Sequence, residues 1–146
     1  MRMSIAILAF ALTASTAQAQ LPFLSKRQPP QPLVQGIDAL RADFAAQSGG
    51  TTVYFGAESV GLAAPARTML AAQAAWLRRH PEVVVRVEGY GDSGDTRDHA
   101  LAVGARRAEE ARSYLVLLGV PAAQLSVTTW GKERPGLGRA VTILVR

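Results

Sequence analysis

The 146-residue sequence contains no cysteine and only two histidines. Without thiols the chain can form no disulfide, hold no thiolate metal site and accept no lipid on cysteine, the modification that tethers bacterial lipoproteins. His80 and His99 have no companion at metal-ligand spacing, so a zinc site is not expected either. We therefore expect no metal, no cofactor and no covalent tether to a membrane.

Long hydrophobic runs are also missing. The apolar run from Ile5 to Thr13 is too short to cross a bilayer core of about 30 Å. A basic start precedes this run and the small residues Ala17-Gln18-Ala19 follow it, which is typical of a secretory signal peptide. We expect residues 1–19 to direct export to the periplasm and the mature chain to have no transmembrane segment. Export makes nucleic acid an improbable partner despite the formal net charge of +5, because the polyanions outside the cytoplasm are cell wall and lipid headgroups.

The rest of the chain divides into a spacer and one domain. Residues 20–36 carry four prolines among polar side chains, a composition that favours an extended linker. Residues 37–50 combine helical spacing with a Ser-Gly-Gly break, which predicts a short helix. Residues 51–146 are long enough for one domain with a single core.

Alternating and helical patterns predict the elements of this domain. A helix expected at 64–79 has Pro65 in its first turn, and a helix expected at 98–118 is followed by Gly119, both of which are typical boundary residues. The order β-α-β-α-β-β predicts an α/β two-layer sandwich, a mixed sheet with two helices on one face. Its strands are expected at residues 51–55, 83–90, 125–130 and 139–145.

A glycine-rich loop and the helix after it supply two opposite charges. Asp92 lies just past the second expected strand, where loops of α/β sheets gather their working groups. On a helical wheel Arg106 points away from the sheet, whereas Arg107 lies about 80° from the centre of the apolar stripe. That stripe consists of Leu101, Gly104, Ala108, Ala111, Leu115 and Leu118.

The expected distance between the two charges suits a ligand. Arg107 stands about 14 Å of helix rise beyond Asp98, at 1.5 Å per residue, so we expect a gap between Arg107 and Asp92 unless the loop folds back along the helix. The small side chains at Gly104 and Ala111 should leave room for the guanidinium. A zwitterion could bridge the gap, but the residues alone leave open that Asp92 is a solvated carboxylate and Arg107 an ion-pair partner at the helix edge.

Several dispersed blocks resemble the OmpA-like peptidoglycan-binding domain, the family of the peptidoglycan-associated lipoprotein and of the periplasmic half of OmpA porins. The resemblance covers residues 51–146. Its blocks are Val53-Tyr54-Phe55, Trp76-Leu77, Val87 to Asp92, Gly104 to Ala108, Tyr114-Leu115, Leu118-Gly119-Val120 and Gly131 to Pro135.

The resemblance implies non-covalent binding of peptidoglycan through the diaminopimelate of its stem peptide. It implies that Asp92 meets the ammonium of this ligand and Arg107 its carboxylate. Gly91, Thr96 and Arg139 are secondary candidates for contact. Residues that differ from the usual family pattern are Tyr90-Gly91, His99-Ala100 and Gly138 to Ala140. These differences keep an alternative open. In it the protein is a subunit of an envelope assembly that has lost wall binding and that contacts a protein partner through the proline-rich segment.

Other functions fit the residues less well. Gly89 to Gly94 satisfies a dinucleotide-binding pattern, but Asp92 inside the loop would repel a pyrophosphate. Ser93 as a hydrolase nucleophile needs a base within hydrogen-bond reach, and His99 is the sole neighbour of that type in sequence. The expected protein is therefore not an enzyme.

Overall fold

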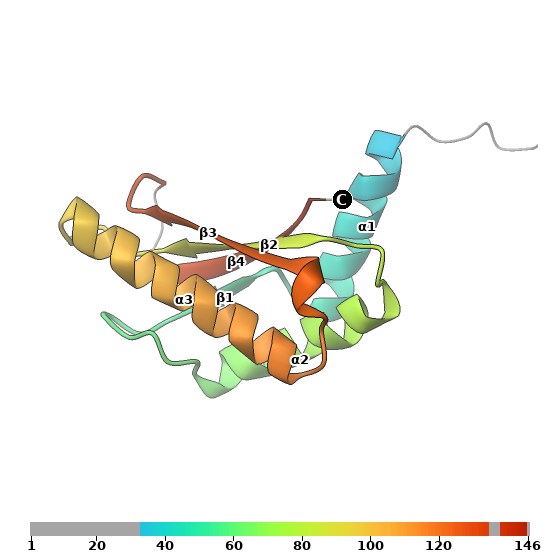
Figure 1. Cartoon of the computed structure of the whole chain (residues 1–146), viewed down its shortest axis with the longest axis horizontal. Coiled ribbons are helices and arrows are strands. Elements are labelled where there is room, and N and C mark those ends of the chain that lie inside the picture. Colours follow the sequence, from blue (N-terminus) through green and yellow to red (C-terminus); the bar gives the residue numbers. More distant parts are fainter. Residues whose placement is uncertain (1–32, 135–137, 146) are drawn as a thin grey trace, which may run out of the picture. The chain divides into compact units, whose positions relative to one another are not determined.

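A computed structural model of the chain describes residues 33–134 and 138–145. The expected signal peptide at 1–19 and the linker up to residue 32 lie outside the described residues. The described residues form three helices and four strands, with a short 3-10 helix before the third strand (Figure 1). They are α1 Leu33–Ser48, β1 Thr52–Tyr54, α2 Ala64–Arg79, β2 Val85–Tyr90, α3 Arg97–Leu117, η1 Ala122–Gln124, β3 Leu125–Gly131 and β4 Arg139–Leu144.

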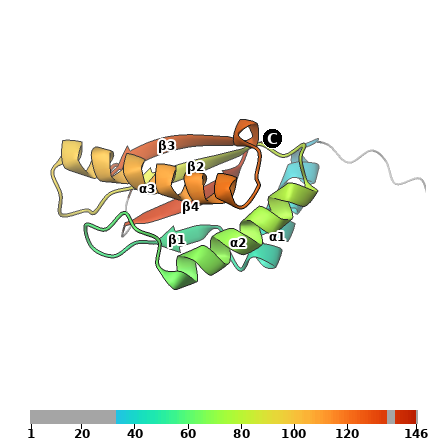
Figure 2. The same ribbon diagram turned by 60° about the horizontal axis from the view of Figure 1, so that its bottom comes forward.

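The strands form one mixed sheet in the order β1-β4-β2-β3. β2 and β3 are parallel, and β4 runs antiparallel to both β1 and β2. Helices α2 and α3 lie on the same side of this sheet (Figure 2). The two-layer α/β arrangement expected from the sequence is therefore confirmed.

Helix ends agree with ordinary capping chemistry. The Thr96 hydroxyl accepts a hydrogen bond from the His99 backbone N–H at 3.3 Å and so caps the start of α3. At its other end Gly119 has a φ of 91°, and the Val120 N–H donates to the Leu115 carbonyl at 3.1 Å. This left-handed glycine terminates the helix as its position in the sequence predicted.

Helix α3 packs unusually close to the sheet because two glycines meet. A Cβ on Gly89 of β2 would overlap the Gly104 carbonyl of α3, and a Cβ on Gly104 would lie 2.6 Å from the Thr129 hydroxyl of β3. The space at Gly104 is thus filled by the sheet rather than by the Arg107 guanidinium, contrary to the expectation from the wheel. The close approach brings the end of β2 and the residue after it alongside the first half of α3.

Helix α1 is longer than expected and packs beside α2. It begins at Leu33, within the segment expected to be linker. Phe44 and Trp76 are both fully buried and meet edge to face, with ring centroids 5.1 Å apart. The Trp76 indole also donates to Asp43 at 2.7 Å, and this bond is the main cause that lowers the Asp43 pKa. Residues 33–48 therefore belong to the folded unit.

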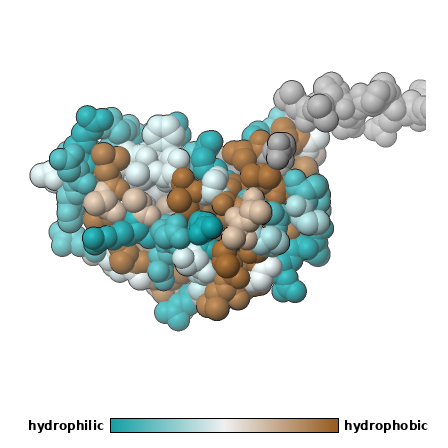
Figure 3. All heavy atoms as spheres, in the orientation of Figure 1, coloured by the Kyte–Doolittle hydropathy of each residue, from teal (hydrophilic) through white to brown (hydrophobic). Residues whose placement is uncertain are grey.

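Hydrophobic residues are unevenly spread over the surface. In the view of Figure 3 hydrophobic patches lie among hydrophilic residues at both ends of the molecule, and they are broader at the end away from the start of α3. Val116 and Leu117 at the end of α3 are among the exposed ones. None of the helices in the described part of the chain is both long and apolar enough to cross a membrane.

Candidate functional site

Asp92 and Arg107 form a direct ion pair. Arg107 Nη1 lies 3.0 Å from Asp92 Oδ1, and Nη2 lies 3.4 Å from Oδ2. The expected gap between the two charges is therefore wrong. β2 and α3 run antiparallel in close contact: Gly89 abuts Gly104, and Gly91 abuts Ala100 in the first turn of α3. The long Arg107 side chain reaches back along the helix to Tyr90 O and Asp92 at this end of the strand.

Arg107 is fully buried and uses every N–H it has. Besides Asp92, its guanidinium donates to three backbone carbonyls. These acceptors are Ser59 O at 2.8 Å from Nε, Tyr90 O at 3.0 Å from Nη1 and Gly56 O at 3.0 Å from Nη2. A guanidinium has five donors, so the five bonds leave none for another group. Arg106, by contrast, is exposed, as the helical wheel predicted.

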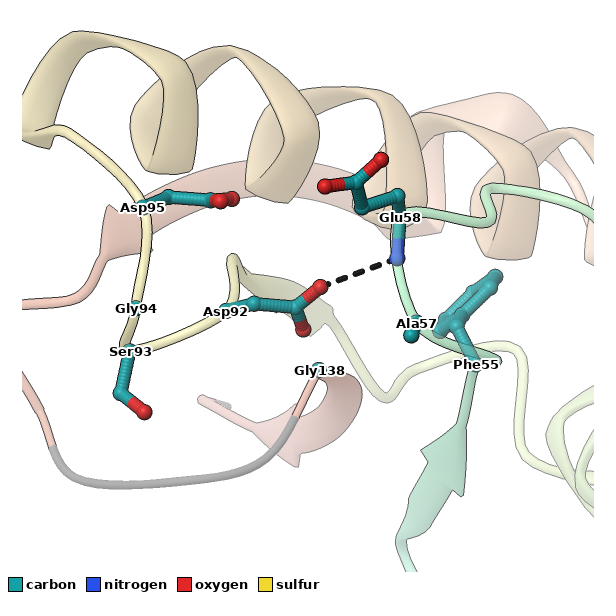
Figure 4. Close-up of a pocket in the computed structure, with 8 residues that line it drawn as sticks. All are labelled: Phe55, Ala57, Glu58, Asp92, Ser93, Gly94, Asp95 and Gly138. Atoms are coloured by element: carbon teal, nitrogen blue, oxygen red, sulfur yellow. Dashed lines mark hydrogen bonds between the residues drawn. The ribbon is translucent and has the colours of Figure 1, made fainter.

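The segment after β1 closes over the pair. The Glu58 backbone N–H donates to Asp92 Oδ2 at 3.0 Å, drawn as the dashed line in Figure 4. Glu58 has a φ of 52°, a left-handed conformation that costs a non-glycine residue free energy. The Phe55 ring lies 5.5 Å from the Arg107 Cζ and covers the guanidinium from another side.

Asp92 is held in its charged form. Its pKa lies below the usual range, chiefly because Arg107 donates to the carboxylate and secondly because the Glu58 N–H does so. About a quarter of the side chain (26%) stays exposed. A ligand can therefore reach the Asp92 carboxylate, whereas it cannot reach Arg107 without displacing a neighbour.

The exposed side of Asp92 opens into a pocket of about 430 Å³. This volume falls within the range of small-molecule sites. Three of its lining side chains are acidic and none is basic, so the pocket attracts cations. The lining consists of Phe55, Ala57, Glu58, Asp92, Ser93, Gly94, Asp95 and Gly138 (Figure 4).

Gly138 lies directly on the ion pair. A Cβ at this position would meet Arg107 Nη1 and would lie 2.5 Å from Asp92 Oδ1. The Gly138 carbonyl also accepts from the Phe55 N–H at 3.0 Å. Glycine at this position, one of the departures from the usual family pattern, is thus required by the close approach of the backbone to the charges.

The three secondary candidates lie outside the pocket lining. Thr96 caps α3, and Gly91 is buried with its N–H donating to the Gly131 carbonyl at 2.9 Å. The Arg139 guanidinium lies 4.1 Å above the Tyr90 ring on the other face of the sheet.

The sequence interpretation missed Phe55, Glu58 and Gly138. Gly56, two residues after β1, and Gly138, directly before β4, could have indicated a close approach of the backbone. Nothing in the sequence indicated the left-handed Glu58.

Ser93 and His99 were the candidates for a nucleophile and its base. The Ser93 side chain points away from Asp92 in Figure 4, and His99 Nε2 lies 3.7 Å from Asp95 Oδ2 instead. Within residues 33–134 and 138–145 no group of three or more potential ligands is placed to hold a metal ion.

Known proteins identify the family to which this architecture belongs. The sequence pattern of the OmpA family matches residues 54–140. The chain belongs to the OmpA family. It is 43% identical over 86 residues to the peptidoglycan-associated lipoprotein of Mesorhizobium japonicum, an alignment that covers 59% of this chain and 51% of that protein. For the peptidoglycan-associated lipoprotein of Pseudomonas aeruginosa the identity is 40% over 99 residues, covering 68% and 58%. The chain thus spans about half the length of the curated relatives it matches.

Solved OmpA-like structures agree with the fold. The crystal structure of the peptidoglycan-associated lipoprotein from Burkholderia pseudomallei has a TM-score of 0.64 at 30% identity, over 66% of this chain and 92% of that one. The C-terminal domain of Helicobacter pylori MotB has a TM-score of 0.58 at 19% identity, over 64% and 81%, which supports the fold alone. The resemblance seen in the sequence is confirmed.

Proposed function

We propose that this OmpA-family chain is a periplasmic, non-enzymatic module that binds peptidoglycan non-covalently through the diaminopimelate of the stem peptide. The observation that carries the proposal is the Asp92–Arg107 ion pair at the foot of an acidic pocket. Curated relatives that align with this region are named for their association with peptidoglycan.

The ammonium end of the ligand enters the pocket and meets Asp92. This carboxylate is charged, partly exposed and flanked by the carboxylates of Glu58 and Asp95. The Arg107 guanidinium balances only one of these three negative charges, so an ammonium in the pocket is attracted by the remaining two. Charge-assisted hydrogen bonds contribute about 1.5–3 kcal/mol each.

The carboxylate end binds Arg107 by exchange. Because all five donors are in use, the ligand must take the place of a present acceptor, and Gly56 O on Nη2 belongs to the segment that covers the site. The same segment donates the Glu58 N–H to Asp92. Its backbone thus offers an acceptor to Arg107 and a donor to Asp92, the same pair of interactions that a zwitterion offers.

The test is binding to purified peptidoglycan sacculi by co-sedimentation. Asp92→Asn keeps the shape of the side chain but removes its charge, and we expect affinity to fall roughly tenfold or more. Arg107→Lys keeps the charge but loses the planar fork, and it should also weaken binding. Arg106→Ala is the matched control, since Arg106 is the exposed neighbour on the same helix.

Free diaminopimelate should compete with the sacculi and shift the amide resonances of Gly56 and Glu58. Equal sedimentation of all four proteins would refute the site. If the wild-type chain fails to sediment at all, the alternative of an envelope subunit without wall binding is favoured instead.

A further inference from the structure

The face of the sheet opposite α2 and α3 carries a cluster of charged and aromatic side chains. Along β2, Val85 and Val87 are fully buried in the core, so the alternation of the strand directs Arg86 and Glu88 to the other side. We call this side the outer face. Its cluster consists of Arg86, Glu88, Tyr90, Trp130, Arg134 and Arg139.

A buried carboxylate lies at the centre of this cluster. The Glu88 side chain is 0% exposed. Arg86 donates to its Oε1 from Nε at 3.0 Å and lies 2.9 Å from it through Nη2, and the Tyr90 hydroxyl donates to Oε2 at 2.8 Å. Arg134 Nη1 lies 3.7 Å from Oε2. A buried charge is costly unless it is paired. Burial of Glu88 therefore favours the conformations in which Arg86, Tyr90 and Arg134 stay beside its carboxylate.

Two aromatic rings hold the other arginines. The Arg134 Cζ lies 3.8 Å from the centre of the Trp130 ring, and the Arg139 Cζ lies 4.1 Å from the centre of the Tyr90 ring. Cation–π contacts of this kind restrict the guanidinium without neutralising it. Arg86 and Arg134 remain 41% and 52% exposed, so both are preorganised and still accessible.

The charge of the cluster favours an anionic partner. Three arginines against one glutamate give the six residues a formal charge of plus two. Tyr54, paired with Arg139 across β1 and β4, is 63% exposed and extends the aromatic surface. Arginine, tryptophan and tyrosine are the residues that dominate protein–protein binding energy, and the guanidinium fork matches a carboxylate.

We propose that the outer face docks a carboxylate-rich segment of a protein partner. A lipid surface fits less well, because attraction to anionic headgroups grows with the number of basic residues near the surface and the cluster has a formal charge of only plus two. Docking at the outer face would be a second function beside wall binding, because the cluster and the Asp92 pocket are formed by different side chains.

The probe is a synthetic peptide of glutamate and tyrosine in alternation, with a glutamine–tyrosine peptide as its neutral match. Titration of the 146-residue chain should shift the Trp130 indole and the Arg86 and Arg134 Nε–H resonances in a saturable way with the acidic peptide only. Arg134→Gln should weaken this binding about fivefold. Arg106→Gln removes the same charge from the exposed side of α3 and should change it little.

Three results would overturn the proposal. In the first, the acidic peptide causes no saturable shift. In the second, Arg106→Gln weakens binding as much as Arg134→Gln does, which would indicate a response to net charge alone. Vesicles of phosphatidylglycerol could shift the same resonances in place of the peptide, which would assign the face to a membrane. Sacculus binding of Arg134→Gln is measured in parallel and should equal that of wild type, so failure of this proposal is separable from failure of wall binding.

Discussion

Replacing Arg107 by methionine tests whether the buried guanidinium holds the site together. Methionine has a similar length but neither charge nor donors. The change leaves the Asp92 carboxylate without its cation and removes the donors that now satisfy Ser59 O, Tyr90 O and Gly56 O. Removing one partner of a buried ion pair costs about 3–5 kcal/mol, and because the side chain is 0% exposed we expect Arg107→Met to fall within this range.

The assay is thermal and urea unfolding. For a domain of this size a loss of about 3–5 kcal/mol lowers Tm by roughly 10–30 °C. Arg106→Met is the matched control and should stay within about 0.5 kcal/mol of wild type, as surface substitutions do. A second change, Asp92→Asn, should restore part of the stability of Arg107→Met, because it removes the carboxylate that has lost its partner.

A loss below about 1 kcal/mol for Arg107→Met, the value of an exposed ion pair, would refute the reasoning. It would mean that the five bonds do not support the fold in solution. The expected large loss has a consequence for binding studies: weak sacculus binding by variants of Arg107 must be interpreted together with their stability, and Asp92→Asn is the cleaner probe of ligand contact.

Two further predictions concern the same pocket. The Asp92 pKa is lowered in the folded state, so its charge contributes stability that is present above the unfolded pKa of about 3.9 and is lost as the pH falls through the folded pKa. The difference in unfolding free energy between wild type and Asp92→Asn should therefore be constant from about pH 5 to 8 and shrink below about pH 4. A difference that persists at low pH would contradict this. Gly138→Ala should cost about 1–3 kcal/mol of stability and weaken sacculus binding, because its Cβ would meet Arg107 and Asp92. Gly94→Ala, with nothing within 4 Å of its Cβ, is the control for stability and should not lower it. Equal stability of the two variants would argue against the close approach at Gly138.

The local patterns of the sequence predicted the elements well where side-chain chemistry decides them. Helix α2 begins and ends at the expected residues 64 and 79. Helix α1 was less predictable: its first turn follows closely on a proline-rich segment, and its stability depends on the tertiary contact of Phe44 with Trp76. Local composition favoured a linker there, but packing against α2 determined the outcome.

The site itself was predictable in its residues and not in its geometry. The wheel separated Arg107 from Arg106, but it placed Arg107 at the helix edge, whereas the structure buries it. The difference arises from Gly89 and Gly104, which let β2 approach α3 so closely that the edge of the helix becomes interior. The expected gap was wrong because it was measured along the helix from Asp98 alone. The extended Arg107 side chain reaches back toward the start of α3, where Gly91 abuts Ala100 and Asp92 follows.

Tyr90 connects the two faces of the sheet. Its backbone carbonyl accepts from Arg107 in the buried site, while its ring supports Arg139 and its hydroxyl donates to Glu88 on the outer face. Burial, followed by the bond to Glu88, raises the pKa of the Tyr90 hydroxyl, which keeps this donor protonated. The bond to Arg107 uses only the Tyr90 backbone carbonyl, which any residue supplies. The Tyr90 side chain, at a position where the sequence departs from the usual family pattern, therefore acts on the outer face and not in the Asp92–Arg107 site.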